Sequence, residues 1–339
     1  MGFVEYLIRR LLLIVLVLFG ITLITFVVTH VVPVDPVAAY AGPQAPPSEV
    51  AQIRQEFGLD KPLPEQYVIY LWGLLRGNLG TSIHDNRPVA SDIGTYLPAT
   101  IELAAAAMVV AIVIGIPGGV LAAVNHNRFV DHLARIGSLA GVSLPVFYLG
   151  LLLLAVFYVK LDVLPGPGQL SIYLDPPPRI TGMMVVDSLL AGNLSDFVDA
   201  LQHLIMPAVV LGVSSAGIIL RITRSSMIET LREEFVRTAR AKGAGRLRVV
   251  VIHALRNAMI PTVTVIGLAF GSLLAGAVLT ETIFSWPGLG MYATTSVVSL
   301  DIPAIMGVTL VAAVAYSLVN LIVDLVYARL DPRIAEARG

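Results

Sequence analysis

A basic segment interrupted by two glycines is the part of this sequence whose residue types best suit a specific interaction. It reads RTARAKGAGRLRVVVIHALRNAMIP and runs from Arg237 to Pro261. Its basic side chains could contact anionic lipid or a protein partner, and its glycines could form a joint between two helices. Because an apolar run follows directly, the basic groups would lie at a membrane surface if that run crosses a bilayer.

Other residues with catalytic or ligand-binding potential show no spacing typical of an enzyme. A P-loop needs a Lys between Gly and Ser or Thr, whereas Lys61, Lys160 and Lys242 are followed by Pro, Leu and Gly. The chain has no cysteine, which excludes thiolate metal sites, disulfides and cysteine catalysis. Its six histidines form no HExxH pattern, and no Gly-x-Ser-x-Gly motif is present. We therefore expect a non-catalytic chain without a metal site or cofactor of its own.

The composition is that of a membrane protein. Hydrophobic residues make up 56% of the 339 residues, only 13% are charged, and the mean hydropathy is +0.83, whereas a soluble domain has about 25% charged residues. The net charge of −1 favours no nucleic-acid partner. Runs of about 20 apolar residues can cross a bilayer, where only a helix satisfies its own backbone groups. The sequence predicts an all-α polytopic membrane protein with six transmembrane helices, at Leu11–Val32, Leu103–Val124, Ile136–Val159, Leu204–Leu220, Met259–Leu279 and Ile302–Val326. The fourth run is the shortest of the six.

The distribution of basic residues predicts the orientation of these helices. Most of the 22 Lys and Arg residues lie in four segments that would share one side of the membrane, namely 1–10, 125–135, 221–258 and 327–339. Basic loops stay in the cytoplasm, so both termini are expected there. The first run is too long for a cleaved signal peptide, and prolines separate it from the cleavage-like triplet Ala39-Tyr40-Ala41. We therefore expect an uncleaved first helix.

This topology divides the chain into four regions. Residues 1–32 form an N-terminal transmembrane helix, and residues 33–97 form an extracytoplasmic helical loop region. Residues 98–330 form a transmembrane core that includes a cytoplasmic loop at 225–258, and residues 331–339 form a cytoplasmic tail.

The extracytoplasmic region 33–97 is predicted to hold two short helices. Ser48 can cap the first, which would end near Phe57 before Gly58. The second, EQYVIYLWGLLRG, carries Tyr67, Tyr70 and Trp72, whose rings are typical of the headgroup level of a membrane. It could be a lid that lies on the outer membrane surface or a docking surface for an extracytoplasmic partner, and the pattern favours neither. The other long outer segment, 161–202, is rich in turns.

The cytoplasmic loop is predicted to form a helix–glycine–helix elbow. Ser226 and Glu229 fit a capping box at the start of the first helix. Glu233 and Arg237 would form an i,i+4 ion pair, and Gly243 would end that helix in a left-handed conformation. A second helix would run from Arg246 to Asn257 into the fifth span. The first helix would carry an apolar stripe in need of cover, formed by Ile228, Leu231, Phe235 and Ala239. The simpler alternative is that the bases only follow the positive-inside rule and touch anionic lipid.

Polar and small residues within the spans have mostly structural interpretations. Glu281 and Asp324 lie near span ends, where we favour capping or pairing over a transport role, and the same holds for Asn320. Two glycine pairs spaced by four, Gly115–Gly119 and Gly267–Gly271, predict close helix packing. Ser214 and Ser215 could either line a pathway or bond to their own helix.

The segment from Arg237 resembles the cytoplasmic EAA loop of membrane subunits in binding-protein-dependent ABC importers. That loop reads Glu-Ala-Ala, three residues, Gly, nine residues, then Ile-x-Leu-Pro. Ala239, Gly243 and Leu255 match it, whereas Arg237, His253 and Arg256 depart from it. The variant RTARAKG…HALRNAMIP is similar to the peptide/nickel branch, in its first, B-type permease subunit. VVPVDPVAA resembles the Pro-Gly-Asp-Pro signature of that branch, with Val34 in the Gly place, and FGLDKPLPEQYVIYLWGLLRGNLGTSI, SLPVFYLG, TETIFSWPGLG and VDLVYARLDPRI agree with it in order.

The resemblance implies a type I ABC importer permease fold in a bacterial cell membrane. It implies a second, related permease subunit, two ATPase subunits that bind ATP and Mg²⁺, and an extracytoplasmic substrate-binding protein. It also implies that the elbow rests in a groove of an ATPase, with coupling residues Arg237, Thr238, Ala239, Arg240, Lys242 and Gly243. The implied cargo is short peptides, with nickel, glutathione or another small solute as alternatives. An ATP-independent secondary transporter and a membrane-embedded enzyme are alternatives of other classes.

Overall fold

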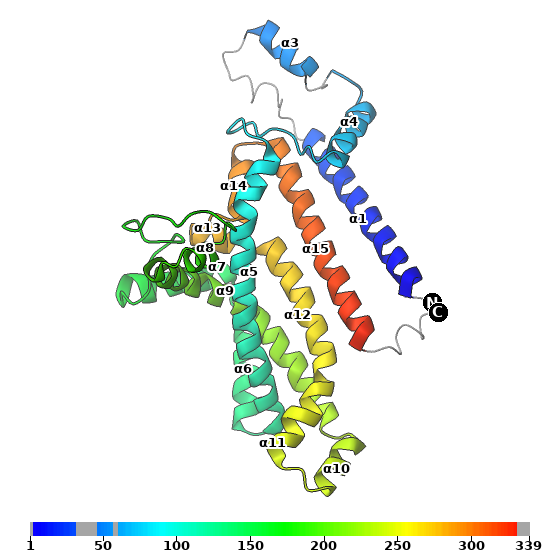
Figure 1. Cartoon of the computed structure of the whole chain (residues 1–339), viewed down its shortest axis with the longest axis vertical. Coiled ribbons are helices and arrows are strands. Elements are labelled where there is room, and N and C mark those ends of the chain that lie inside the picture. Colours follow the sequence, from blue (N-terminus) through cyan, green and yellow to red (C-terminus); the bar gives the residue numbers. More distant parts are fainter. Residues whose placement is uncertain (1–2, 32–45, 57–59, 331–339) are drawn as a thin grey trace.

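The computed structural model describes residues 3–31, 46–56 and 60–330, and this part of the chain is helical apart from turns and one isolated bridge between Thr81 and Pro88. The all-α prediction is therefore confirmed (Figure 1). The stretch VVPVDPVAA beyond its first residue, the triplet Ala39-Tyr40-Ala41, Phe57 and the tail 331–339 lie outside the described residues.

Five helices are long and apolar enough to cross a membrane. They are α1 (Phe3–Val31), α5 (Val89–Val124), α9 (Leu194–Thr230), the helix Arg246–Ala275 that includes most of α12 (Arg256–Gly276), and α15 (Ile302–Leu330). Since α5 begins at Val89, residues 89–97 of the expected outer region form its first turns.

The third predicted span, Ile136–Val159, is not one continuous helix. It is divided into α6 (Phe129–Ser143), α7 (Val146–Leu153) and the π-helical segment η1 (Leu154–Lys160), and α6 is bent by 100° relative to the helix that follows. The break falls at Leu144, whose backbone is extended, directly before Pro145. Proline disfavours the helical conformation in the residue before it, which favours a break at this position. Within the described residues there are thus five helices that could span a membrane, or six if this bent pair counts as one span.

The fourth predicted span, Leu204–Leu220, is much longer than its apolar run. It is the centre of α9, a 37-residue helix, and most of its residues are buried. Polar residues limit the apolar run at both ends. The helix nevertheless continues, because the side chains of these residues have hydrogen-bond partners. The Nδ1 atom of His203 lies 2.9 Å from the carbonyl oxygen of Asp199, and Thr223 Oγ1 lies 3.3 Å from Thr262 Oγ1.

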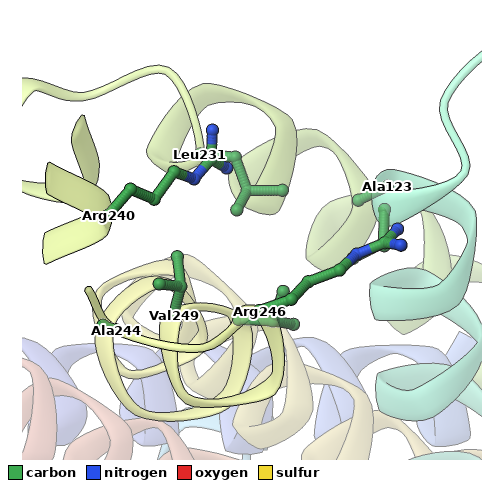
Figure 2. Close-up of a pocket in the computed structure, with 8 residues that line it drawn as sticks. Ala123, Leu231, Arg240, Ala244, Arg246 and Val249 are labelled. Carbon is green, nitrogen blue, oxygen red and sulfur yellow. The ribbon is translucent and has the colours of Figure 1, made fainter.

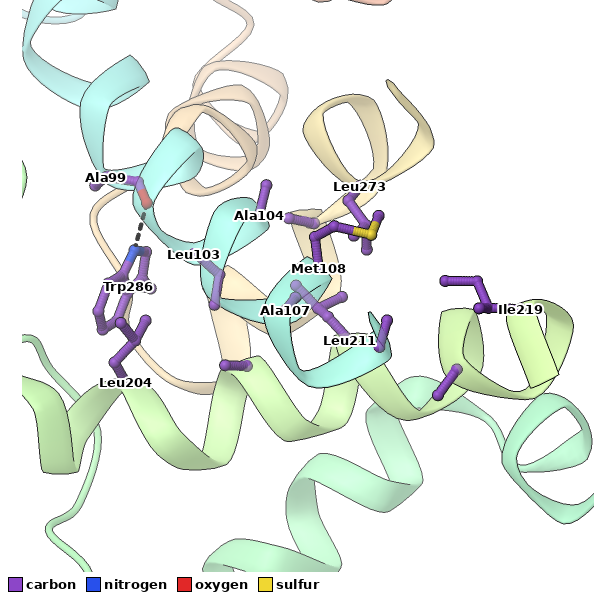
Figure 3. Close-up of a cluster of buried hydrophobic side chains, with 14 residues drawn as sticks. Ala99, Leu103, Ala104, Ala107, Met108, Leu204, Leu211, Ile219, Leu273 and Trp286 are labelled. Atoms are coloured by element: carbon purple, nitrogen blue, oxygen red, sulfur yellow. Dashed lines mark hydrogen bonds between the residues drawn. The ribbon is translucent and has the colours of Figure 1, made fainter. Parts of the chain in front are cut away.

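The core lies between α5 and α9, and small residues let these helices approach closely. A Cβ atom at Gly115 would meet Ile219 of α9, and one at Gly119 would meet Thr223. Figure 3 shows the apolar side chains that fill this interface, with Leu273 from α12 beside Met108. Gly267 likewise faces Val323 of α15 and Gly271 faces Tyr316, so the packing interpretation of both glycine pairs is confirmed.

Short helices connect or flank the long ones. They include α3 (Pro47–Glu56) and α4 (Leu63–Leu75), which correspond to the two predicted outer helices, and α8 (Met184–Leu190), α13 (Val278–Ile283) and α14 (Leu289–Val298). Of these, α3 and α4 lie at the end of the molecule remote from the elbow (Figure 1). Pro64 lies in the first turn of α4, where a missing N–H costs little.

Buried or half-buried carboxylates hold several elements in place. Glu281 accepts hydrogen bonds from Gly290 N at 2.6 Å and Met291 N at 3.0 Å, which caps α14. Glu102 of α5 accepts from the first amides of α8 in the same way. Asp199 of α9 accepts from the backbone and hydroxyl of Ser171, both at 2.7 Å. At the other end, Asp324 pairs with Arg10 of α1 at 3.0 Å, so the structural interpretations of Glu281 and Asp324 are confirmed.

Candidate functional site

The elbow exists and is built from two helices joined through glycine. After α9 ends at Thr230, a short turn leads into α10 (Glu234–Ala241), and α11 (Arg246–Arg248) then starts the helix that continues into α12. Gly243 has φ +82°, so the predicted left-handed joint is confirmed. A Cβ atom at Gly243 would meet nothing within 4 Å. The backbone conformation alone therefore favours glycine at this position.

The first helix of the elbow begins later than the capping box predicts. Ser226 lies inside α9, where its carbonyl oxygen accepts a hydrogen bond from the Thr230 hydroxyl at 2.8 Å. The chain continues as helix there because Met227 is fully buried against Ala254 and Ala258. This tertiary packing outweighs a local stop signal. The break comes instead at the turn that follows Thr230, and α10 has no side-chain cap.

The predicted apolar stripe is consequently divided between two helices. Ile228 belongs to α9 and Leu231 to the turn, where both pack against the cluster around Met227, whereas Phe235 and Ala239 belong to α10. Phe235 is exposed, and Val236, which the pattern did not single out, is fully buried.

The ion pair predicted between Glu233 and Arg237 also has a different partner. Arg237 pairs with Glu234 at 3.1 Å, and both side chains are largely exposed, so this pair contributes little stability.

The six predicted coupling residues lie together on α10 and the joint that follows it. All are exposed except Ala239, which is half-buried. Leu247, between two arginines on α11, is also largely exposed and was missed by the sequence analysis.

A partly open cavity of about 400 Å³ lies between the elbow and the ends of α5 and α9. Figure 2 shows Arg240 of α10 and Arg246 of α11 reaching toward it, with Leu231 and Val249 between them. Neither arginine forms an ion pair within the described part of the chain. An apolar floor with an unpaired basic rim can bind an acidic or polar surface of a partner. Sequence reasoning missed the floor, because its residues come from three distant segments: Ala123, Val124, Leu231, Ala244, Val249 and Val250.

Beneath the elbow, a buried ion pair joins α6 to α9. The carboxylate of Asp131, at the start of α6, is fully buried and accepts two hydrogen bonds from the guanidinium of Arg224 on α9, including Nη2 to Oδ2 at 2.8 Å. The amide of Asn127 donates to the same carboxylate at 2.8 Å. Since Arg224 lies two turns before the end of α9, the helix that carries the elbow is fixed to the start of α6.

The helix predicted from Arg246 to Asn257 is present but is not regular. Residues Val249–Leu255 form the π-helical segment η2, in which Val249 and Ala254 are buried. π-helical turns often mark functional sites, and here one connects the elbow to a membrane span.

Comparisons with known proteins agree with this geometry. Residues 115–336, which include the elbow, match the family described as binding-protein-dependent transport system inner membrane component, and residues 3–104 match its N-terminal counterpart. The chain is 49% identical over 325 residues to the probable D,D-dipeptide transport system permease protein DdpB of Escherichia coli (strain K12), with 96% of each chain covered. It is 46% identical over 333 residues to the dipeptide transport system permease protein DppB of the same strain, covering 97% of this chain and 98% of that one. Identity to the glutathione transport system permease protein GsiC of Escherichia coli O6:H1 is 38% over 330 residues, covering 97% and 98%.

Proposed function

Because this chain belongs to the family of inner membrane components of binding-protein-dependent transport systems, we propose that it forms part of the pathway of an ATP-driven importer for short peptides. The membership and the helical spans confirm the expected type I permease fold. Peptide cargo is supported by the names of the relatives, since D,D-dipeptides, dipeptides and glutathione are all short peptides.

The elbow is the surface that couples this chain to ATP hydrolysis. The observation that carries this proposal is the exposed α10 together with a cavity rimmed by two arginines that have no acidic partner in the described residues. A partner ATPase that filled this cavity could neutralise Arg240 and Arg246 and cover Phe235. Movement of that ATPase would then act on α9 and α12, because α10 lies between them in the chain.

The other functions of the importer belong to other subunits. ATP and Mg²⁺ bind to two ATPase subunits, a second permease subunit completes the pathway, and a binding protein delivers cargo from outside. Both termini and the elbow lie in the cytoplasm. This orientation is supported by the basic residues of the elbow at one end of the molecule and by α3 and α4 at the other (Figure 1).

The importer can be tested after purification through an affinity tag on this chain. We expect ATPase subunits to copurify and the reconstituted assembly to take up a dipeptide only with ATP, whereas the chain alone neither hydrolyses ATP nor transports. Stoichiometric ATP turnover by the chain alone would contradict the proposal. Uptake by the chain alone in response to a proton gradient would instead identify a secondary transporter.

A further inference from the structure

Helix α4 contacts α1 within the stretch that crosses the membrane. The hydroxyl oxygen of Tyr67 lies 3.1 Å from that of Thr22, and the Tyr67 ring lies 6.1 Å from Phe19 and 5.2 Å from Phe26, centroid to centroid. The apolar span of α1 ends at Thr29. At a rise of about 1.5 Å per residue, Phe19 lies about 15 Å inside that end. Helix α4 therefore reaches α1 alongside its span and not only above it.

The side of α4 that faces away from α1 is apolar as well. Val68, Trp72 and Leu75 follow one another at i, i+4 and i+7 and are 64%, 56% and 80% exposed. We name these three residues the α4 stripe. A helix with one face in water carries polar residues there, so an apolar stripe on the free face indicates a second apolar environment.

Helix α1 also exposes apolar side chains beside its contact with α4. Helix α1 is a membrane span with most of its side chains exposed, including Ile24, Val27 and Val28 next to the residues that contact α4. The guanidinium of Arg76 lies 4.7 Å from the centre of the Trp72 ring, at the end of α4. Trp is enriched where a membrane meets water, and an arginine beside it can extend to lipid phosphates.

We propose that α4 is inserted into the outer leaflet of the membrane, where the α4 stripe contacts lipid acyl chains and Arg76 contacts the headgroups. Of the two alternatives that the sequence left open for this helix, the membrane is the partner. A soluble binding protein dissociates after delivering its cargo and would return the stripe to water, whereas lipid covers it permanently.

Spin labels can test this contact directly, because the chain has no cysteine and single labels can be placed in the full chain in liposomes. Variants Val68→Cys and Leu75→Cys report on the α4 stripe. Ile24→Cys on α1, with the same 64% exposure as Val68, is the lipid control, and Ser48→Cys on α3 is the water control. We expect labels at Val68 and Leu75 to collide with oxygen and to lose collisions with a water-soluble nickel chelate down to the level of Ile24→Cys. Chelate collisions equal to those of Ser48→Cys would overturn the proposal.

Two further measurements separate lipid from protein as the occupant. In the assembled importer, loss of both oxygen and chelate collisions at Val68 would mean that a protein covers the stripe, which also overturns the proposal. Trp72 and the fully buried Trp286 are the two tryptophans of the chain. Brominated phospholipids should therefore quench the fluorescence of the parent chain but not of Trp72→Phe, and equal quenching of both would contradict the insertion. These outcomes do not depend on cargo, which peptide uptake measures separately.

Discussion

Gly243 forms the joint between α10 and α11 through its backbone alone. Its φ of +82° lies in the left-handed region, and the space around it is open, so a side chain there would meet strain and not a steric clash. Gly245, two residues later, has φ −62° and ψ 153°, a conformation open to any residue. Only Gly243 thus has a backbone conformation that favours glycine. The same substitution at Gly245 can therefore serve as a control for one at Gly243.

Gly243→Val should uncouple the importer while leaving the chain in the membrane. Valine in a left-handed conformation costs about 1–2 kcal/mol, which would tilt α10 away from its partner without affecting the spans. We expect peptide uptake and copurification of ATPase subunits to fall steeply at normal membrane levels, and Gly245→Val to behave like the parent. Coupling through the elbow is wrong if Gly243→Val transports normally while loss of the charges at Arg240, Lys242 and Arg246 prevents insertion.

The buried ion pair between Asp131 and Arg224 should matter far more for stability than the exposed pair between Glu234 and Arg237. Breaking a buried pair leaves an uncompensated charge and costs about 3 kcal/mol or more, whereas an exposed pair contributes below about 1 kcal/mol. We expect Asp131→Asn to lower the melting temperature of the purified chain clearly and Glu234→Gln to leave it nearly unchanged. Equal shifts in the two variants would show that Asp131 is not the structural lock beneath the elbow.

Helix α14 depends on a carboxylate from the preceding helix. All partners of Glu281 are donors: the amides of Gly290 and Met291, and the hydroxyl of Thr100 at 2.7 Å. A carboxylate, with two acceptor oxygens, suits these three donors. Gly288 leaves room for the carboxylate, because a Cβ atom at position 288 would lie 2.4 Å from its carbon. The element is thus positioned by one side chain and not by its own sequence.

Glu281→Gln should loosen α14 selectively. The amide group of glutamine would bring N–H donors against other donors, which costs about 1–3 kcal/mol for an unsatisfied buried group. Hydrogen exchange in the full importer should become faster at the first amides of α14, while the neighbouring exposed substitution Thr282→Ala should leave it unchanged. Unaltered exchange in Glu281→Gln would contradict this role.

The sequence predicted those elements that depend on local chemistry. Gly243 adopts a left-handed conformation, and Gly115 and Gly267 allow close helix contacts, because glycine has no side chain. This property does not depend on the surrounding structure. The capping box at Ser226 failed because packing of Met227 overrides a local signal. The third span was placed correctly as an apolar segment, but hydropathy alone does not reveal its bend at Pro145. The floor of the cavity joins residues more than 100 positions apart, which no local pattern reveals.

At the scale of the whole molecule, the two ends have distinct characters. The elbow with its basic residues lies at one end, and α3 and α4 lie at the other (Figure 1). The basic end is expected to be cytoplasmic. A single introduced cysteine can test this, because the chain has no native thiols that would also react.

Cysteine labelling in intact cells should distinguish the two ends. We expect an impermeant thiol reagent to modify Ser48→Cys and Thr81→Cys directly, and Thr238→Cys on α10 only after permeabilisation. All three positions lie outside the membrane spans, so differences in burial within a span do not affect the comparison. The opposite pattern would reverse the orientation and with it the cytoplasmic role of the elbow.

Helix α9 reaches from the outer segment to the elbow without interruption. Its 37 residues correspond to a rod of about 55 Å, with Asp199 holding the outer segment near one end and Arg224 near the other. A rod of that length acts as a lever: a tilt of about 5° would displace one end relative to the other by about 5 Å. Pro207 lies inside this helix without ending it. A displacement that begins at the elbow would therefore reach the segment held by Asp199 through one continuous helix, with no loop in between to absorb it.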